Sequence, residues 1–329
     1  MGLNIGFLLM MKLCTWKKFE QSFQQREKMK IPPYLKPGDT IGLICPAGAM
    51  PIEKAQTAIN VLQEWGFKII TGTSVGSSHY YFSGTDDDRL ADLQSMMDDT
   101  SVKAILCARG GYGTGRIVDR LHFKKFKKHP KWIIGFSDIT VLHCHLLSRY
   151  KIASLHAPMA AAFNDDQYTN PYVQSLHEAL IGKKTRILSA SHPFNRYGRV
   201  EGILAGGNLS LLTHLIGTSS DVNMDGKILF IEDTGEYLYN VDRMLYQLKR
   251  NGKFEKLAGL IVGGFTDMKD TNTPFGKSIE EIINEVIKDY NFPVCFSFPI
   301  SHEKENFAVK IGLKYKLSIK KNTISLQEL

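Results

Sequence analysis

The stretch WIIGFSDITVLHCHLL, residues 132–147, predicts a strand, a sharp turn and a helix in immediate succession. A short run of large apolar residues stops at Gly135, and from Ser137 onward the apolar residues recur at the spacing of one helix face. A serine on such a turn projects its hydroxyl above the carboxyl edge of a sheet, where the first N–H groups of the helix point toward the attacked atom. The stretch therefore has the pattern of a nucleophile elbow.

The same serine also has a purely structural interpretation. The segment Gly135-Phe136-Ser137-Asp138 lacks the second glycine of the hydrolase motif G-x-S-x-G. Serine is among the residues preferred at a helix N-cap, where its side chain accepts a hydrogen bond from a backbone N–H. This stretch alone leaves both interpretations open and favours the cap.

Strands and helices alternate on either side of this stretch. Strands are predicted at residues 40–45, 67–71, 102–107, 132–134 and 152–155, and helices are predicted from Pro51, from the acidic triplet Asp86 to Asp88, and after the glycine-rich loop Gly110–Gly115. This alternation indicates an α/β fold with a parallel sheet covered by helices on both faces. Because ligands bind beyond the carboxyl ends of such strands, we expect the glycine-rich loop and Ser137 to share one crevice.

The chain has 329 residues, which is enough for two domains. We expect a disordered leader at residues 1–30, an N-terminal α/β domain at 31–160, a polar linker region with one helix at 161–196, and a C-terminal domain at 197–329. In the last of these, strands are predicted at 200–204, 228–231, 260–262 and 294–298, helices at 208–216, 239–249 and 279–290, and closing strands at 307–319. The apolar run 6–11 is too short to span a membrane and lacks the basic start of a signal peptide, so no membrane contact is expected.

The formal net charge of +8 is spread along the chain, and its densest run extends from Lys124 to Lys128. A run of this kind usually forms the solvated face of a helix. Nucleic-acid binding requires more, such as interleaved aromatic residues or a recognition motif. The sequence contains neither, so nucleic acid is not expected as a partner.

The cysteines are odd in number, widely spaced and without a C-x-x-C pair: Cys14, Cys45, Cys107, Cys144 and Cys295. This usage indicates reduced, mostly buried thiols and a cytoplasmic location. The motif His-Glu-x-x-His is absent, and the histidines do not cluster with cysteines or acids at ligand spacing. We therefore expect no metal site and no cofactor.

The loop Gly110–Gly115 invites three interpretations. Clustered glycines let backbone N–H groups approach a phosphate, but neither the P-loop pattern nor G-x-G-x-x-G is present. The same N–H groups could form an oxyanion hole for a tetrahedral intermediate. A tight turn that requires positive φ would also explain the glycines. The residues alone do not choose between the last two.

A nucleophilic Ser137 would need a general base, and several histidines are candidates. His143 and His145 lie on the helix that Ser137 begins, so their side chains should point away from its first turn. His156 could belong to a loop or to the core. His302 follows the predicted strand 294–298, where a loop at the strand end could bring it to the crevice.

The base would need a carboxylate to orient it. Glu232 directly follows the hydrophobic strand 228–231, which places it at the edge of a sheet and not on a helix face. Asp233 and Glu236 are close competitors for the role. Spacing alone does not select one of the three.

At this point six motifs, in order along the chain, resemble those of the LD-carboxypeptidases, the serine peptidases that trim muropeptides. They are YLKPGDTIGLICPAG (34–48), ARGGYGTGR (108–116), IIGFSDIT (133–140), GILAGGNLSLL (202–212), IEDTGEYLYNVDRML (231–245) and a late His302-x-x-x-Asn306. The resemblance extends from about Ile31 to Ile319. The whole ordered set is far more specific than any single motif.

The resemblance implies a flavodoxin-like N-terminal domain that carries the nucleophile and a swivelling β/β/α C-terminal domain that carries the acid and the base. It implies a catalytic triad of Ser137, Glu232 and His302. Members of the family are commonly homodimers, and they release the terminal D-alanine from the tetrapeptide of cytoplasmic, recycled cell-wall fragments. The bond that they cut joins the L-centre of a diamino acid to the D-residue.

The chain departs from the family pattern near the histidine. Family members often carry glycine before the histidine and Pro-x-Gly after the asparagine, where this chain has Ser301 and Lys310-Ile311-Gly312. We expect these changes to lie on the substrate side of the loop and to affect specificity. One branch of the family hydrolyses aminoacyl-nucleotide antibiotics of the microcin type and confers self-immunity. The segment Gly235-Glu236-Tyr237 looks more like the muropeptide branch.

The remaining candidate residues follow from this chemistry. The backbone N–H groups of Asp138 and of Gly110 or Gly111 are candidates for the oxyanion hole. Arg109 and Tyr112 are candidates for substrate binding, because a guanidinium pairs bidentately with the free carboxylate of an exopeptidase substrate. An ordinary structural salt bridge is the alternative for Arg109. The rival function from a different class is a non-catalytic binder of a nucleotide or a sugar phosphate, which would use the glycine-rich loop and nearby lysines.

Overall fold

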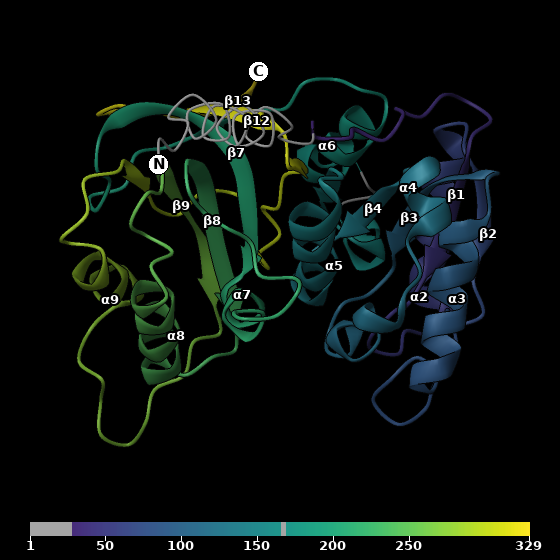
Figure 1. The fold of residues 1–329 in the computed structure, drawn as a ribbon, viewed down its shortest axis with the longest axis horizontal. Coiled ribbons are helices and arrows are strands. Elements are labelled where there is room, and N and C mark those ends of the chain that lie inside the picture. The colour runs from purple at the N-terminus through teal and green to yellow at the C-terminus, as the bar shows by residue number, and fades with distance from the viewer. Residues whose placement is uncertain (1–27, 166–168) are drawn as a thin grey trace, which may run out of the picture.

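The structure is a computed structural model that describes residues 28–165 and 169–329. Nearly all of the expected leader, residues 1–30, lies outside the described residues, and so does Cys14. Two sheets stand side by side, one built mainly from the N-terminal half and one from the C-terminal half (Figure 1). The α/β class and the two-domain architecture predicted from the sequence are confirmed.

The first sheet has six strands in the order β11-β5-β4-β3-β1-β2. Its parallel strands are β1 (Thr40–Ile44), β2 (Lys68–Thr71), β3 (Val102–Cys107), β4 (Trp132–Gly135) and β5 (Ser154–His156). The parallel order 2-1-3-4-5 is that of the flavodoxin-like fold, which is what the resemblance implies. The sixth strand, β11 (Val309–Ile311), comes from the far end of the chain and runs antiparallel to β5.

The helices of this half are α2 (Ile52–Glu64), α3 (Asp86–Asp98), α4 (Lys124–Lys128), α5 (Thr140–His145) and α6 (Pro171–Leu180). A capping box between Thr85 and Asp88 begins α3. The helix expected directly after the glycine-rich loop is absent, and two 3-10 turns (Thr114–Arg116 and Val118–Arg120) precede the short α4. Gly113 has a φ of +139°, which no α-helix accommodates, so the helix cannot begin in the loop.

The second sheet has seven strands in the order β10-β9-β8-β7-β12-β13-β6. Its parallel strands are β7 (Gly198–Asn208), β8 (Lys227–Thr234), β9 (Gly259–Thr266) and β10 (Val294–Cys295), and the antiparallel ones are β12 (Lys314–Ile319), β13 (Ile324–Glu328) and β6 (Arg186–Ser189). The strand predicted at 294–298 stops early, because Ser297 has a φ of +51°. Strand β6 lies within the residues predicted as a linker, and β13 was not predicted.

The helices of the second half are α7 (Leu209–His214), α8 (Leu238–Arg250) and α9 (Ile279–Val286), and α8 packs between the other two (Figure 1). Helix α5 of the first half packs against α7 and β7 of the second. The chain passes from the first sheet to the second between β11 and β12, through Gly312, whose φ is +91°. Within the described residues, no helix combines the length and the apolar character needed to cross a membrane.

Two expectations from composition can be compared with this fold. The four cysteines in the described part of the chain are buried and free, as expected for structural thiols. In α4, Phe126 is buried and the lysines around it are exposed, so the basic run forms a solvated face as predicted.

Candidate active site

Ser137 lies on a strained turn directly after β4. Its φ is +62°, a left-handed conformation that costs a residue with a side chain about 1–2 kcal/mol. Phe136 occupies the N-cap of the 3-10 turn Ser137–Ile139, and no side chain caps it. The cap interpretation of Ser137 is therefore wrong, because the serine lies inside the turn and not before it. Strain of this kind is typical of functional positions.

The start of the turn is held by His143 from within the following helix. Its Nε2–H donates to the carbonyl oxygen of Gly135 at 2.8 Å, and its Nδ1 lies 2.8 Å from the Ser154 hydroxyl. Complete burial lowers the pKa of His143 to about 4, so the ring is neutral near pH 7. The expectation that the His143 side chain points away from the first turn is therefore wrong, because its ring bonds to Gly135, two residues before Ser137. Both of its ring nitrogens are used by Gly135 and Ser154, so His143 holds the turn and is not the base.

The glycine-rich loop packs directly on the Ser137 turn. A Cβ on Gly110 would lie 3.1 Å from the Cβ of Ser137 and 3.3 Å from the backbone nitrogen of Asp138. The buried carboxylate of Asp138 accepts a hydrogen bond from the Thr114 N–H at 2.8 Å and so ties the loop to the turn. Gly111 has a φ of +100°, so the tight-turn explanation for the glycines is confirmed.

This packing brings the candidate oxyanion-hole groups together. The N–H groups of Gly110, Gly111 and Asp138 donate to no acceptor among the residues that the structure describes. The same loop can therefore be a tight turn and also form an oxyanion hole. Its candidate N–H groups lie close to Ser137.

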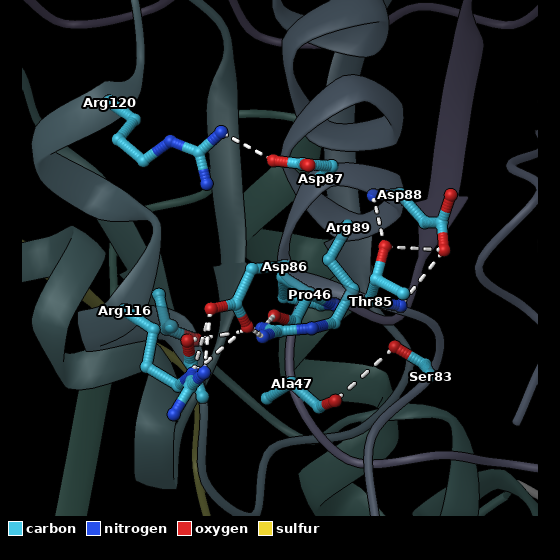
Figure 2. A network of polar contacts seen from close by, with 12 residues as sticks. Pro46, Ala47, Ser83, Thr85, Asp86, Asp87, Asp88, Arg89, Arg116 and Arg120 are labelled. Carbon is cyan, nitrogen blue, oxygen red and sulfur yellow. Dashed lines mark hydrogen bonds and ion pairs between the residues drawn. The ribbon is translucent and has the colours of Figure 1, made fainter. Parts of the chain in front are cut away.

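A network centred on Arg89 supports the loop from the other side, as Figure 2 shows. The fully buried Arg89 donates through Nη1 to the carbonyl oxygens of Pro46 at 2.6 Å and Gly113 at 3.0 Å, and its Nη2 pairs with Asp86. Asp86 also pairs with Arg116 at 2.8 Å. Asp86, the first residue of the acidic triplet that the sequence analysis placed in the first turn of a helix, thus helps to fix the glycine-rich loop as well.

On the other side of the site, Glu232 and His302 form a hydrogen-bonded pair. Nδ1–H of His302 donates to Oε2 of Glu232, whose side chain is fully buried in β8. Burial lowers the pKa of His302, but the hydrogen bond and the negative charge of Glu232, together with that of Asp233, outweigh it and raise the pKa above its ordinary value. Because Nδ1 is used by Glu232, Nε2 is the ring nitrogen left to exchange a proton.

The structure also separates Glu232 from its two competitors. Asp233 accepts hydrogen bonds from the Asn208 side chain at 2.8 Å and from the Ser210 N–H at 2.9 Å, so it holds the start of α7. Burial is the main reason that the pKa of Asp233 is raised to about 6. Glu236 accepts a hydrogen bond from the Asn240 side chain at 3.1 Å. Within the described ranges, neither carboxylate forms a hydrogen bond with a histidine.

The serine turn and the Glu232–His302 pair meet between the two halves of the molecule. The Phe136 ring packs edge-on against the His302 ring, with centroids 4.9 Å apart. Asn208 lies opposite Glu232 in the β7–β8 pairing, and its N–H donates to the Thr140 hydroxyl at 3.1 Å. Among the described residues, no hydrogen bond joins Ser137 to His302. The predicted triad is brought into one region, with the serine still unbonded to the base.

Two pairs of adjacent glycines make this approach possible, and the sequence analysis missed their role. In β7, a Cβ on Gly207 would lie 2.4 Å from the Thr140 hydroxyl oxygen, so the helix that follows Ser137 can only pack there against glycine. In β9, a Cβ on Gly263 would lie 2.0 Å from the Ile300 carbonyl oxygen. The motifs AGGN and VGGF, each near a strand end, are the signal that could have revealed these contacts.

A cavity of about 460 Å³ opens beside His302. Its wall includes Arg109, Phe136, Met159, His302 and Asn306. The Arg109 guanidinium donates to the Ala49 carbonyl oxygen and forms no ion pair with an acid in the described ranges, so the structural salt bridge expected as an alternative is not found there. Tyr112 is exposed, packs near Phe82 with centroids 6.0 Å apart, and does not line the cavity.

His156 and Asn306 are further polar residues at the site. His156 ends β5 and is fully buried, and its Nε2 lies 3.1 Å from Oδ1 of Asn306. Burial lowers the pKa of His156 to about 3, which keeps the ring neutral. Their sequence separation of 150 residues gives no local signal of this contact.

The departure at Lys310 has a structural explanation. Lys310 lies in β11, is fully buried, and forms an ion pair with Glu328 of β13 at 2.9 Å. It does not line the cavity, so the expectation that this change lies on the substrate side is wrong for Lys310. Its ammonium instead ties the first sheet to the second.

The comparisons with known proteins agree with this geometry. Residues 41–157 match the LD-carboxypeptidase N-terminal domain, and residues 201–317 match the LD-carboxypeptidase C-terminal domain. A probable murein peptide carboxypeptidase of Bacillus subtilis is 37% identical over 90% of this chain and 94% of its own length. A murein tetrapeptide carboxypeptidase of Pseudomonas aeruginosa is 30% identical over 83% of this chain and 91% of its own length.

Among solved structures, the muramoyltetrapeptide carboxypeptidase of Oxalobacter formigenes superimposes with a TM-score of 0.80 at 30% identity. The superposition covers 88% of this chain and 98% of that one. The likeness therefore includes both sheets and the region between them.

Proposed function

Because the chain belongs to the LD-carboxypeptidase family, we propose that it is a serine carboxypeptidase that releases the terminal D-alanine from murein tetrapeptides by hydrolysing an L,D-peptide bond. The names of its relatives support this substrate class. The observation that carries the proposal is the buried Glu232–His302 pair, which packs against Phe136 next to the strained Ser137.

In the acylation step, the Ser137 hydroxyl oxygen attacks the carbonyl carbon of the L,D-bond. Nε2 of His302 removes the hydroxyl proton, and Glu232 holds the imidazole in the required tautomer and stabilises the imidazolium. The Ser137 hydroxyl must first come within hydrogen-bond reach of Nε2, since no hydrogen bond joins the serine to the base among the described residues.

The negative charge that develops on the carbonyl oxygen is stabilised by backbone N–H groups. Asp138 and Gly110 or Gly111 supply them, and these groups are preorganised because Asp138 and Arg89 fix the loop. Each such donor is worth about 3–4 kcal/mol of transition-state stabilisation in related serine enzymes.

Collapse of the tetrahedral intermediate breaks the C–N bond. The imidazolium of His302 gives its proton to the departing amine of D-alanine, and the acyl group remains on Ser137 as an ester. Water then attacks the ester with His302 again as the base, which frees the carboxylate of the diamino acid and restores the serine hydroxyl.

Selection of a terminal residue requires recognition of its free carboxylate. Arg109 can supply it, because its guanidinium is anchored on the Ala49 carbonyl oxygen, borders the cavity, and has further N–H donors that bond to no acceptor in the described part of the chain. Tyr112 stays a prediction as a substrate-binding residue.

To test the proposal, the purified protein is incubated with the tetrapeptide L-Ala-γ-D-Glu-meso-diaminopimelyl-D-Ala. Mass spectrometry then measures the D-alanine released from the peptide. An aminoacyl sulfamoyl adenosine, incubated in parallel, tests the microcin-type alternative. Release of D-alanine by the wild-type chain and not by Ser137→Ala is the expected result. Cleavage of the sulfamoyl compound alone, or of neither compound, would contradict the proposal.

The cytoplasmic location and the homodimer implied by the resemblance stay predictions. Cell fractionation checks the location. Light scattering coupled to size-exclusion chromatography checks the dimer, because it reports the mass of the particle directly.

A further inference from the structure

In the side-chain amide of Asn306, the oxygen has hydrogen-bond partners and the nitrogen has none among the described residues. The side chain is 3% exposed and belongs to the wall of the cavity beside His302. Its Oδ1 accepts two hydrogen bonds, one from the Ser301 N–H at 3.3 Å and one from Nε2–H of His156 at 3.1 Å. Its Nδ2 is buried and has no partner among the described residues.

The two donors to Oδ1 fix the orientation of the amide. A backbone N–H can only donate, so the end of the amide that faces Ser301 must be the oxygen. The same orientation makes Nε2 of His156 the protonated ring nitrogen. The NH₂ group is thereby held in one direction, away from both of these partners.

A buried donor without an acceptor costs free energy, and native structures rarely keep one unless it serves a purpose. The chain could remove that cost with an apolar or acceptor side chain. The cavity lining also contains charged side chains of both signs, and its Arg109 forms no ion pair within the described chain. Asn306, whose NH₂ group is unpaired in the described ranges, and Arg109 both line this cavity, and both offer N–H donors to a ligand rich in acceptor oxygens.

We propose that Nδ2 of Asn306 donates a hydrogen bond to an acceptor oxygen of the bound peptide, and that His156 is the positioning residue that aims it. The inference rests on the proposed function, because it takes a peptide with free carboxylates as the ligand. It adds a specificity contact from the segment that carries His302, whereas Arg109 follows β3 of the other half.

Binding of the tetrapeptide to the Ser137→Ala protein, measured by isothermal titration calorimetry, tests the contact without turnover. Adding Asn306→Asp keeps an oxygen for the Ser301 and His156 donors and replaces only the NH₂ group. The expected result is an increase in Kd of about tenfold or more, because an acceptor then faces an acceptor.

Two further variants complete the experiment. Asn195→Asp is the matched control: the Oδ1 of Asn195 also accepts a backbone N–H, from Phe296 at 2.9 Å, but the residue does not line the cavity, so Kd should not change. His156→Phe keeps a ring between Phe136 and Phe230 and removes the donor, so we expect Kd to rise about threefold.

A Kd within twofold of the parent value for Asn306→Asp, with an unchanged melting temperature, would overturn the inference. If Asn306→Asp does not fold, His156→Phe decides, and an unchanged Kd for that variant overturns it. Failure of the proposed function gives a different result: wild-type protein that releases no D-alanine and a Ser137→Ala parent that does not bind the tetrapeptide.

Discussion

The two sides of the site are held in different ways. Ser137 lies between a strand and a helix, with Gly135 bonded to His143 and Asp138 bonded to the glycine-rich loop. His302 lies on residues 300–308, which contain neither helix nor strand, and Ile300 approaches β9 so closely that only glycine fits at position 263. The Ser137 turn is thus held by hydrogen bonds on both sides of the serine. The position of His302 depends instead on packing between segments that are distant in the chain.

This difference between the two sides predicts which substitutions should reduce activity without reducing stability. On the Ser137 side, the loss of one side chain should remove chemistry and leave the fold unchanged. On the loop side, a change that never touches substrate should still displace the base. The following predictions test this difference, from the largest expected effect to the smallest.

The largest effect is expected from Ser137→Ala, with His302→Ala close to it. Either change removes a member of a cooperative triad, so kcat should fall by about 10⁴-fold or more. The melting temperature of Ser137→Ala should stay nearly unchanged, because the serine side chain does not hold the fold together. His302→Ala should lower it, because the buried Glu232 then loses its partner. Steady-state release of D-alanine and thermal denaturation measure the two quantities. If Ser137→Ala unfolds the protein while residual activity persists, the serine is structural.

Glu232→Gln should lower kcat by about 10³-fold, because an amide no longer stabilises the imidazolium. It should also change the pH dependence. In the wild-type protein His302 must be neutral to act as a base, so kcat/KM should rise with pH through a pKa above 6.5. Without the carboxylate, burial lowers that pKa, and the acidic limb should move to lower pH. If the acidic limb of the kcat/KM profile does not move in Glu232→Gln, Glu232 is not the carboxylate that raises the pKa of His302.

The same pair makes a prediction for stability. The pKa of His302 is raised on folding, so the pair contributes stability fully below the unfolded pKa of about 6.5 and loses it as pH rises through the folded pKa. The difference in melting temperature between wild type and Glu232→Gln should therefore be larger at pH 5.5 than at pH 8.5. Differential scanning fluorimetry at the two pH values checks the sign.

Gly263→Ala tests the loop side directly. The new Cβ would lie 2.0 Å from the Ile300 carbonyl oxygen, so the segment before His302 must move. A displacement of about 1 Å at the base should cost about 10²-fold in kcat. Gly115→Ala is the control, because its Cβ would meet nothing closer than 3.8 Å. Equal kinetics for the two variants would show that the loop is not held by this contact.

Arg109→Ala should raise KM by about tenfold for the tetrapeptide, since a charge-assisted hydrogen bond contributes about 1.5–3 kcal/mol and water recovers part of it. A tetrapeptide that ends in D-alaninamide lacks the carboxylate and serves as the control substrate. Wild type and variant should bind this amide about equally. A KM increase of the same size for both substrates would mean that Arg109 supports the cavity and not the carboxylate.

The smallest effect concerns the strain at Ser137. Glycine adopts positive φ without the cost of a Cβ, so Ser137→Gly should raise the free energy of unfolding by about 0.5–1 kcal/mol relative to Ser137→Ala. Urea denaturation of these two inactive variants measures the difference. A more stable alanine variant would show that the turn is not strained.

The sequence could predict whatever depends on neighbours along the chain. Apolar periodicity predicted β4 and the turn at Ser137, and the hydrophobic run 228–231 predicted β8, although that strand continues through Glu232 to Thr234 and Glu232 does not lie at its edge. The six ordered motifs indicated the family, and the resemblance to that family indicated the three candidate triad residues. These features are local, because strand and helix patterns repeat over two and 3.6 residues.

Only the tertiary structure decided how the distant parts meet. It chose Glu232 over Asp233 by the direction of one carboxylate, and it placed β11 beside β5 in the first sheet, with a buried ion pair to the second. It also joined His156 to Asn306 and pressed glycine backbones against carbonyl oxygens. Such contacts arise from close packing between segments far apart in the chain, and a one-dimensional pattern does not record which surfaces will be pressed together.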